Sequence, residues 1–348
     1  MQRETKAGMN MKSTRIIVVG TSAGGLDALK KLVAQLPAKL GAAVFIVQHL
    51  SADSNAEVLV ATLKKAGALP CTEARDGESW QPDHIYVAPA DQHLMLGKAK
   101  IMVTKGAREN RSRPAIDPLF RSAAVAHGNR VIGVLLTGQL DDGTAGLVAI
   151  KRCGGTCVVQ EPSDAAYPDM PENAVQNAQI DHCVPIAQMG GLLATLVKKR
   201  TSTRTRVPRD LMIEAKIAER VLSDLKSVDA LGAQVPFNCP GCGGVLWEIS
   251  EGSALRYRCH TGHSYTAPVL LAEQTAKIEE TLWIALRMFE ERKNLLSTIA
   301  KGTATAHTRS ASERAKESEI HIERIRTMLR STDKTRRARG QGQRAERP

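Results

Sequence analysis

The sequence predicts an α/β fold: a three-layer domain built on a parallel sheet, followed by a small zinc-ribbon-like module and a helical hairpin. The first observation is a short apolar run, residues 16–19, followed by glycines and then by a helical pattern of apolar residues at 26–33. This order is typical of a strand, a tight turn and a helix. The second is that two further apolar runs, 44–47 and 131–136, end in polar residues. Continuous short apolar runs are typical of strands that helices cover on both faces.

The turn after the first strand, residues 20–25, has the sequence Gly-Thr-Ser-Ala-Gly-Gly. Ser22 at its tip lies next to the free N–H groups of the following helix, and the glycines allow a sharp backbone and the close approach of a substrate. This is the pattern of a nucleophile elbow. Similar turns bind phosphate or another anion. A dinucleotide site does not fit, because the glycine spacing differs and the next apolar run ends in Gln48-His49 instead of an acidic residue.

Polar side chains suited to acyl transfer follow two other strands of the predicted sheet. His49 follows the second strand, and the third apolar run leads to Asp141 and Asp142. Because the carboxyl ends of parallel strands lie along one edge, Ser22, His49 and an aspartate can meet there. In such a triad the imidazole takes the serine proton and the carboxylate orients the imidazole. Spacing alone does not choose between the two aspartates. It also leaves open that His49 is a surface or core histidine without a catalytic role, and that Asp142 with the following glycine only forms a turn.

Several segments resemble the motifs of CheB-type protein-glutamate methylesterases. They are residues 20–25, Gln48-His49, Leu136-Thr137-Gly138 with Asp142-Gly143, residues 85–94, residues 113–124, and Met170-Pro171 before Asp181-His182. The resemblance spans residues 13–198 and implies that Ser22 is the nucleophile, His49 the general base and Asp142 the orienting acid. It implies hydrolysis of γ-glutamyl methyl esters on methyl-accepting chemoreceptors, beside a chemotaxis methyltransferase system. Some family members also deamidate receptor glutamines.

The sequence departs from that family pattern in two places. Residues 139–141 are Gln-Leu-Asp, where the family usually has Met-Gly and one variable residue, which leaves the oxyanion geometry open. Family members commonly carry an N-terminal receiver domain over the active site, whereas only a polar tail precedes the first strand here. We therefore expect no phosphorylation-gated relief of inhibition within this chain.

Three of the seven cysteines form a pattern of their own. Cys239 and Cys242 form a Cys-x-x-Cys turn, and Cys259 and His263 follow after 16 intervening residues. Three thiolates and an imidazole complete a tetrahedral site, for which zinc is the usual ion. His263 fits better than His260, because the glycine before it permits a second tight turn. A module without metal, or a redox Cys-x-x-Cys pair, is the alternative.

The remaining segments differ in composition. Two amphipathic patterns joined by a glycine-containing loop predict a helical hairpin, whose apolar stripe packs on itself, on the ribbon, on a second copy or on a receptor helix. The arginine-rich end has few apolar residues, which predicts disorder. The expected divisions are a polar tail (1–12), the catalytic domain (13–198), a linker with a short helix (199–235), the zinc ribbon (236–266), the helical hairpin (267–330) and a basic disordered tail (331–348).

Composition excludes several classes of protein. There is no run of about 20 apolar residues and no apolar signal segment, so we expect a cytoplasmic protein without a membrane span. The net charge is +12, of which +7 falls on residues 201–348, but no recognition helix or aromatic basic patch supports DNA binding. We predict a cytoplasmic Ser-His-Asp carboxylic ester hydrolase with no catalytic cofactor and a structural zinc. A non-catalytic anion-binding or receptor-adaptor protein is the alternative; the receptor and the oligomeric state stay open.

Overall fold

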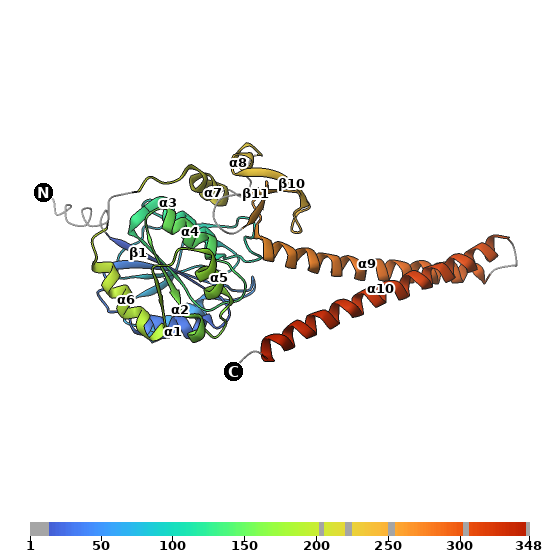
Figure 1. Ribbon diagram of the computed structural model, residues 1–348, viewed down its shortest axis with the longest axis horizontal. Coiled ribbons are helices and arrows are strands. Elements are labelled where there is room, and N and C mark those ends of the chain that lie inside the picture. Colours follow the sequence, from blue (N-terminus) through green and yellow to red (C-terminus); the bar gives the residue numbers. More distant parts are fainter. Residues whose placement is uncertain (1–13, 202–204, 220–224, 250–254, 302–305, 346–348) are drawn as a thin grey trace. The chain divides into compact units, whose positions relative to one another are not determined.

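The structure is a computed structural model that describes residues 14–201, 205–219, 225–249, 255–301 and 306–345 (Figure 1). The expected polar tail at 1–12 lies outside the described residues. The chain divides into two compact units, Met1–Leu270 and Leu271–Pro348. Among the described helices, none is long and apolar enough to cross a membrane.

In the described part of the first unit, a parallel sheet of seven strands forms the centre. Its strands lie in the order β3-β4-β2-β1-β7-β8-β9. Strands β1 and β2 contain the first two predicted apolar runs, β7 contains all but the last residue of the third, and every residue of β1 and β7 is buried. The bounds are β1 Arg15–Thr21, β2 Ala42–Gln48, β3 Cys71–Glu73, β4 Ile85–Val87, β7 Val131–Leu135, β8 Thr156–Gln160 and β9 His182–Val184. A separate antiparallel pair is formed by β5 His93–Leu96 and β6 Ile101–Thr104.

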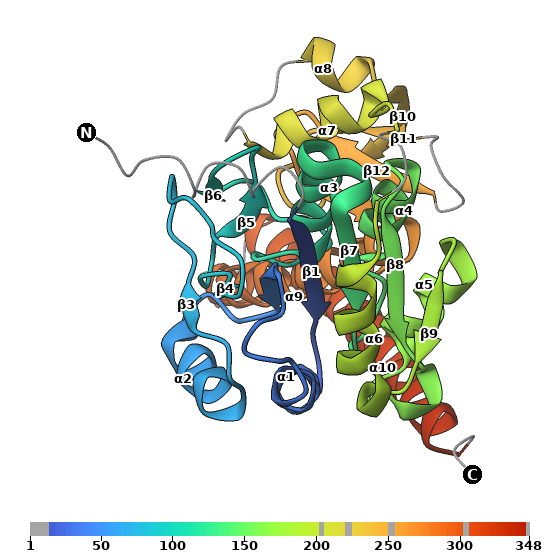
Figure 2. The same ribbon diagram turned by 90° about the vertical axis from the view of Figure 1, so that its left-hand side faces the viewer.

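Helices cover both faces of this sheet (Figure 1 and Figure 2). Apolar residues of α1, α2 and α6 pack in one buried cluster with one face of the central strands, and those of α3, α4 and α5 pack in another with the opposite face. The predicted three-layer α/β core is therefore confirmed. The bounds are α1 Gly25–Ala34, α2 Ala56–Ala66, α3 Ile116–His127, α4 Thr144–Arg152, α5 Asp169–Asn177 and α6 Ile186–Lys198, with 3₁₀ turns at Gly128–Arg130 and Pro162–Asp164.

The segment expected to be a linker with one short helix contains two helices, α7 Arg209–Glu219 and α8 Leu225–Asp229. Leu211 of α7 is buried in the cluster beneath α3 and α4, and the neighbouring Asp210 accepts two hydrogen bonds from Arg152. This part of the segment therefore packs on the core, because α7 is amphipathic and buries its apolar face.

The ribbon module, residues 232–266, is a four-stranded antiparallel sheet in the order β10-β11-β12-β13. Its bounds are β10 Gly232–Asn238, β11 Val245–Ile249, β12 Arg256–Cys259 and β13 Ser264–Thr266. The predicted hairpin is the β11–β12 pair. The sheet begins at residue 232, before the expected boundary at 236, because β10 pairs with β11 from its first residue.

The second unit consists of two long helices. Helix α9 spans Ala267–Ala300 and begins at the expected start of the hairpin, and α10 spans Ala306–Ala345. Pairs such as Glu290 with Arg326 and Lys293 with Glu319 show that the helices are antiparallel, which confirms the predicted hairpin. The expected disordered tail differs from the structure, in which α10 continues to residue 345. Arginine, alanine, lysine and glutamine favour a helix, and extending an existing helix needs no new nucleus.

Candidate active site

Ser22 lies directly between β1 and α1, at the carboxyl edge of the sheet. Its N–H donates to Thr137 O at 3.0 Å, which ties the turn to the segment after β7. Gly24, the residue before α1, has φ 73°, a left-handed conformation that glycine adopts without steric cost. A side chain at Gly25 would overlap the Gln48 carboxamide. The glycines of the motif thus serve the sharp turn that the sequence predicts.

His49 connects Ser22 to Asp142. Its Nδ1 lies 3.0 Å from Ser22 Oγ, and its Nε2 lies 2.7 Å from Asp142 Oδ2. Because an ionised carboxylate only accepts hydrogen bonds, Nε2 is the donor, and Nδ1 of the neutral ring is left to accept from the serine hydroxyl. The structure thus brings the three predicted residues into one hydrogen-bonded chain.

Asp142 is buried and held by four donors. Besides His49, Ile116 N–H donates to Oδ2 at 2.7 Å, and Asn110 Nδ2 and Asp117 N–H donate to Oδ1 at 3.0 and 3.2 Å. The two backbone donors are the first N–H groups of α3, which helix geometry leaves unpaired. Burial opposes ionisation of Asp142, but the hydrogen bonds from His49, Ile116 N–H and Asn110 hold its pKa below the usual value.

A second buried carboxyl, Asp117, supports the first. Gly143 N–H and Gly146 N–H donate to its Oδ1 at 3.1 and 2.7 Å, and Asn110 Nδ2 donates to its Oδ2 at 3.0 Å. Burial, and then the charge of Asp142, raise the pKa of Asp117 to about 8. Sequence reasoning assigned no role to Asn110 or Asp117. Asp117 lies inside segment 113–124, which carried the resemblance, but no role was assigned to it, and Asn110 lies outside the segments that resemble the family.

The neighbouring Asp141 does not reach His49. It is buried, and burial raises its pKa, while the nearby Thr266 hydroxyl of the ribbon lowers it. The geometry therefore separates the two aspartates that spacing left open: Asp142 hydrogen-bonds the imidazole and Asp141 faces the ribbon.

The departure from the family pattern at 139–141 forms a tight turn. Leu140 has φ 65°, and its carbonyl accepts from Asn173 Nδ2 at 2.9 Å. Gly138 N–H is already paired with Tyr167 O at 3.0 Å. In the part of the chain that the structure describes, Ala23 N–H donates to no backbone carbonyl. Ala23 is the residue after Ser22, and its N–H is the donor best placed by the chain for a developing oxyanion.

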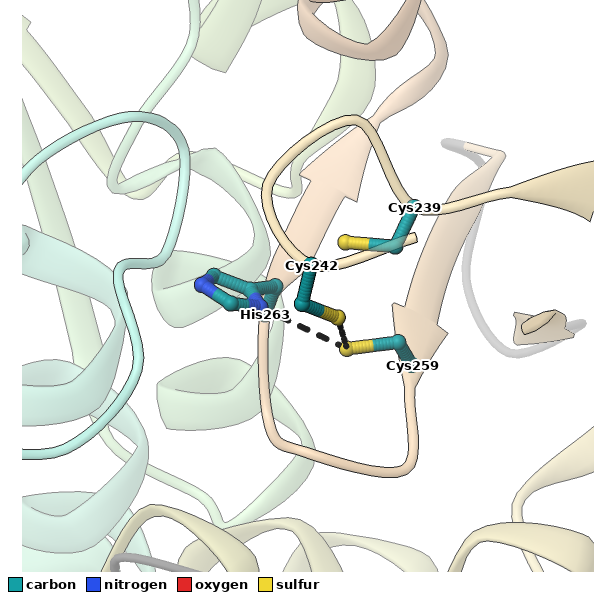
Figure 3. Close-up of side chains that lie close together, drawn as sticks. All are labelled: Cys239, Cys242, Cys259 and His263. Atoms are coloured by element: carbon teal, nitrogen blue, oxygen red, sulfur yellow. Dashed lines mark hydrogen bonds between the residues drawn. The ribbon is translucent and has the colours of Figure 1, made fainter. Parts of the chain in front are cut away.

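The ribbon gathers the predicted metal ligands. Figure 3 shows the sulfur atoms of Cys239, Cys242 and Cys259 converging with the His263 ring, and the four ligand atoms lie within 4.8 Å of one another. Cys242 Sγ and Cys259 Sγ are 3.7 Å apart, and Cys259 Sγ is 3.5 Å from His263 Nδ1. Ligands at about 2.3 Å from a tetrahedral zinc ion are separated by about 3.8 Å. The donor set and its spacing therefore fit zinc.

The turn that carries the first two ligands has the form of a metal knuckle. It follows β10, and Gly243 N–H donates to Cys239 O at 2.7 Å. Redox Cys-x-x-Cys pairs typically open a helix, whose N-terminus lowers the thiol pKa. No helix begins at this turn in the described residues. The local structure favours metal binding over redox chemistry.

Three comparisons relate the chain to known proteins. The family model described as CheB methylesterase matches residues 17–193. A relative from Leptospira interrogans serogroup Icterohaemorrhagiae serovar copenhageni, named "Putative protein-glutamate methylesterase/protein-glutamine glutaminase", is 36% identical over 189 residues, covering 54% of this chain and 97% of the relative. The protein-glutamate methylesterase/protein-glutamine glutaminase of Bordetella bronchiseptica is 36% identical over 193 residues, covering 54% of this chain and 55% of the relative. The crystal structure of the Thermotoga maritima CheB methylesterase catalytic domain matches with a TM-score of 0.51 and 31% identity, covering 53% of this chain and all of that chain.

Proposed function

The chain belongs to the CheB methylesterase family, and we propose from this that it hydrolyses γ-glutamyl methyl esters on chemoreceptors in the cytoplasm. The observation that carries the proposal is the hydrogen-bonded chain Ser22–His49–Asp142, which lies inside the matched segment. Glutamine side chains present the same carbonyl with ammonia as the leaving group, so the proposal includes deamidation, as the names of the relatives suggest.

Acylation begins with Ser22. His49 Nδ1 takes the hydroxyl proton while Oγ forms a bond to the ester carbonyl carbon. Asp142 keeps the other proton on Nε2 and stabilises the imidazolium charge. Ala23 N–H, in the turn before α1, donates to the oxyanion of the tetrahedral intermediate. The C–OCH₃ bond then breaks, His49 returns its proton to the leaving oxygen, and methanol departs.

Deacylation reverses these roles. His49 Nδ1 takes a proton from water while the water oxygen attacks the acyl carbon. The bond to Ser22 Oγ breaks, the serine recovers its proton, and a glutamate side chain leaves. Throughout, the lowered pKa of Asp142 keeps the carboxylate charged, which is the state that the imidazolium requires.

We also propose that Cys239, Cys242, Cys259 and His263 hold a structural zinc ion. A bound zinc supplies a cross-link between the two turns of the ribbon, a module whose own core cluster is small. Protein purified without added metal is expected to contain one zinc per chain, and the Cys242→Ser variant clearly less. Metal content near zero in the wild type would contradict the assignment.

Release of labelled methanol from methylated chemoreceptor membranes tests the catalytic proposal. We expect release by the wild type and none by Ser22→Ala, with Ser54→Ala, a half-buried serine in the loop after His49, as the matched control. A fluorophosphonate probe should label native wild type at Ser22 and not label Ser22→Ala. Labelling without methanol release would support Ser22 as the nucleophile and refute the proposed methyl-ester substrate. No labelling would favour the non-catalytic anion-binding or adaptor alternative.

A further inference from the structure

Asn110 connects the two buried carboxyl groups of the active site, those of Asp142 and Asp117. Its single amide group donates to Asp142 and to Asp117, both at 3.0 Å, and the residue is 5% exposed. Asn110 and Arg111 both have positive φ, 47° and 69°. Asparagine adopts this left-handed conformation more readily than most residues, whereas for Arg111 it is uncommon. The position of the Asp142 carboxylate therefore depends on what holds this loop.

The ribbon holds it through its main chain. Asn110 N–H donates to Ser264 O at 2.8 Å, and Ser264 N–H donates to Arg108 O at 3.4 Å. Residue 264 begins β13 and directly follows the metal ligand His263. The residue that orients the carboxylate and the metal ligand are thus joined by one short stretch of paired backbone.

Buried charges make a second connection. Arg258 of β12, which is fully buried, donates to Glu109 at 2.8 Å and to Gly262 O at 3.1 Å, inside the turn between the last two metal ligands. Glu109 also accepts from Arg121 of α3 at 2.8 and 3.0 Å. Removing one partner of a buried ion pair leaves an uncompensated charge, so this network resists displacement of the turn relative to the loop.

We infer that the ribbon is a positioning element of the catalytic centre: its metal-bound turn holds the loop 108–111, and Asn110 from that loop orients the Asp142 carboxylate toward His49. Loss of the metal frees the turn, weakens the backbone pairing at Ser264 and releases the carboxylate. The catalytic rate then depends on metal occupancy. This inference rests on the proposed function, since it needs Asp142 to act on His49.

Two buried arginines on the same strand offer a matched pair of variants. Arg256 donates to Glu214 at 3.0 and 3.1 Å, whereas Arg258 joins the metal turn to Glu109 and lies 3.6 Å from Glu214. We expect Arg258→Met to lower the rate of fluorophosphonate labelling about tenfold or more, a typical result of misplaced catalytic groups. Arg256→Met should lower it by about threefold at most, and Arg258→Lys should recover part of the loss. Thermal unfolding shows whether both methionine variants are folded.

The pH profile separates positioning from general loss of structure. Asn110→Ala removes a donor to the Asp142 carboxylate and so leaves more of its negative charge to stabilise the imidazolium. The acid limb of kcat/KM, which reports protonation of the general base, should therefore move to higher pH in Asn110→Ala and in Arg258→Met, and stay in place in Arg256→Met. An unshifted limb in both of the first two variants would overturn the inference, even if their rates fell.

Metal removal tests the same coupling in the full chain. Chelator-treated wild type, shown to be metal-free by atomic emission, should label with fluorophosphonate about tenfold more slowly, and added Zn²⁺ should restore the rate; Cys183→Ser, a cysteine outside the cluster, should behave as wild type. Equal labelling with and without metal, or equal labelling of Arg258→Met and Arg256→Met, would overturn the inference and leave the proposed function intact. Failure of the metal-loaded wild type to label would instead overturn the proposed function, and the inference with it.

Discussion

Replacing Asp142 by asparagine changes one oxygen of a carboxylate that accepts four hydrogen bonds. With the new NH₂ group at the Oδ1 position, it meets the donors of Asn110 and Asp117. At the Oδ2 position it meets His49 Nε2 and the Ile116 N–H. The second orientation is the less costly, because His49 can move its proton to Nδ1 and accept from the amide. Nδ1–H then faces Ser22, and the imidazole can no longer take the serine proton.

The expected loss in kcat is about 10⁴-fold, as for a triad with the wrong histidine tautomer. That factor corresponds to about 5 kcal/mol of transition-state stabilisation. In this orientation the Ile116 N–H loses its acceptor. An unpaired buried donor lowers the free energy of unfolding by about 1–3 kcal/mol, so the variant is expected to fold.

Two assays measure this loss: methanol release from methylated receptors and the rate of fluorophosphonate labelling, with thermal unfolding as the check on the fold. Asp141→Asn is the matched control, because Asp141 is buried beside Asp142 but faces the ribbon. Its rate should lie within about tenfold of the wild type. The reasoning is refuted if folded Asp142→Asn retains more than about a tenth of the wild-type rate, or if Asp141→Asn is the more damaging change.

Two further predictions concern acid stability and the space around the nucleophile. Burial opposes ionisation of Glu214, but its arginine neighbours lower its pKa well below the usual value, so its stabilising effect is complete above the unfolded pKa of about 4.3 and is lost as the pH falls toward the lower folded value. Urea unfolding between pH 5 and pH 2.5 should therefore show that wild type loses about 1.4 kcal/mol per pH unit more than Glu214→Gln below pH 4; parallel curves would contradict the assignment. A Cβ at Gly138 would overlap Met170 Sδ and lie 2.8 Å from Ser22 Cβ, so Gly138→Ala should lower kcat about 10²-fold. Gly191→Ala, where a Cβ meets no atom within 4 Å, is its control. Equal rates for the two variants would contradict the expected clash of a Cβ at residue 138 with Met170 and Ser22.

Local patterns were sufficient where the structure depends on neighbours in the chain. The apolar runs of β1, β2 and β7 and the glycine turn at residues 20–25 are each encoded within a few residues. Because parallel strands end at one edge, these elements together predicted that Ser22, His49 and an aspartate would meet. The start of the helical hairpin at residue 267 was predicted for the same reason, since helical periodicity is local.

Patterns were insufficient where the structure depends on distant partners. Glu109 and Arg258 are far apart in the chain and look like ordinary surface charges in the sequence, yet they form a buried pair. Leu211 lies in a segment whose composition indicates a linker, and it is buried because a hydrophobic surface of the core lies beside it. Neither the buried ion pair nor the burial of Leu211 can be predicted from the residues next to them in the chain.

The sequence by itself determined the α/β core, the nucleophile turn and the set of ligand types in the ribbon, because each follows from local spacing. Spacing left Asp141 and Asp142 open, and the family resemblance implied Asp142. Only the tertiary structure decided that Asp142 lies within hydrogen-bond distance of His49, that Nε2 faces the carboxylate, and that Asn110 joins the site. Those choices depend on the direction of the first N–H groups of α3 and on the backbone pairing of the ribbon with residues 108–110. Such contacts arise only when elements distant in the sequence pack together.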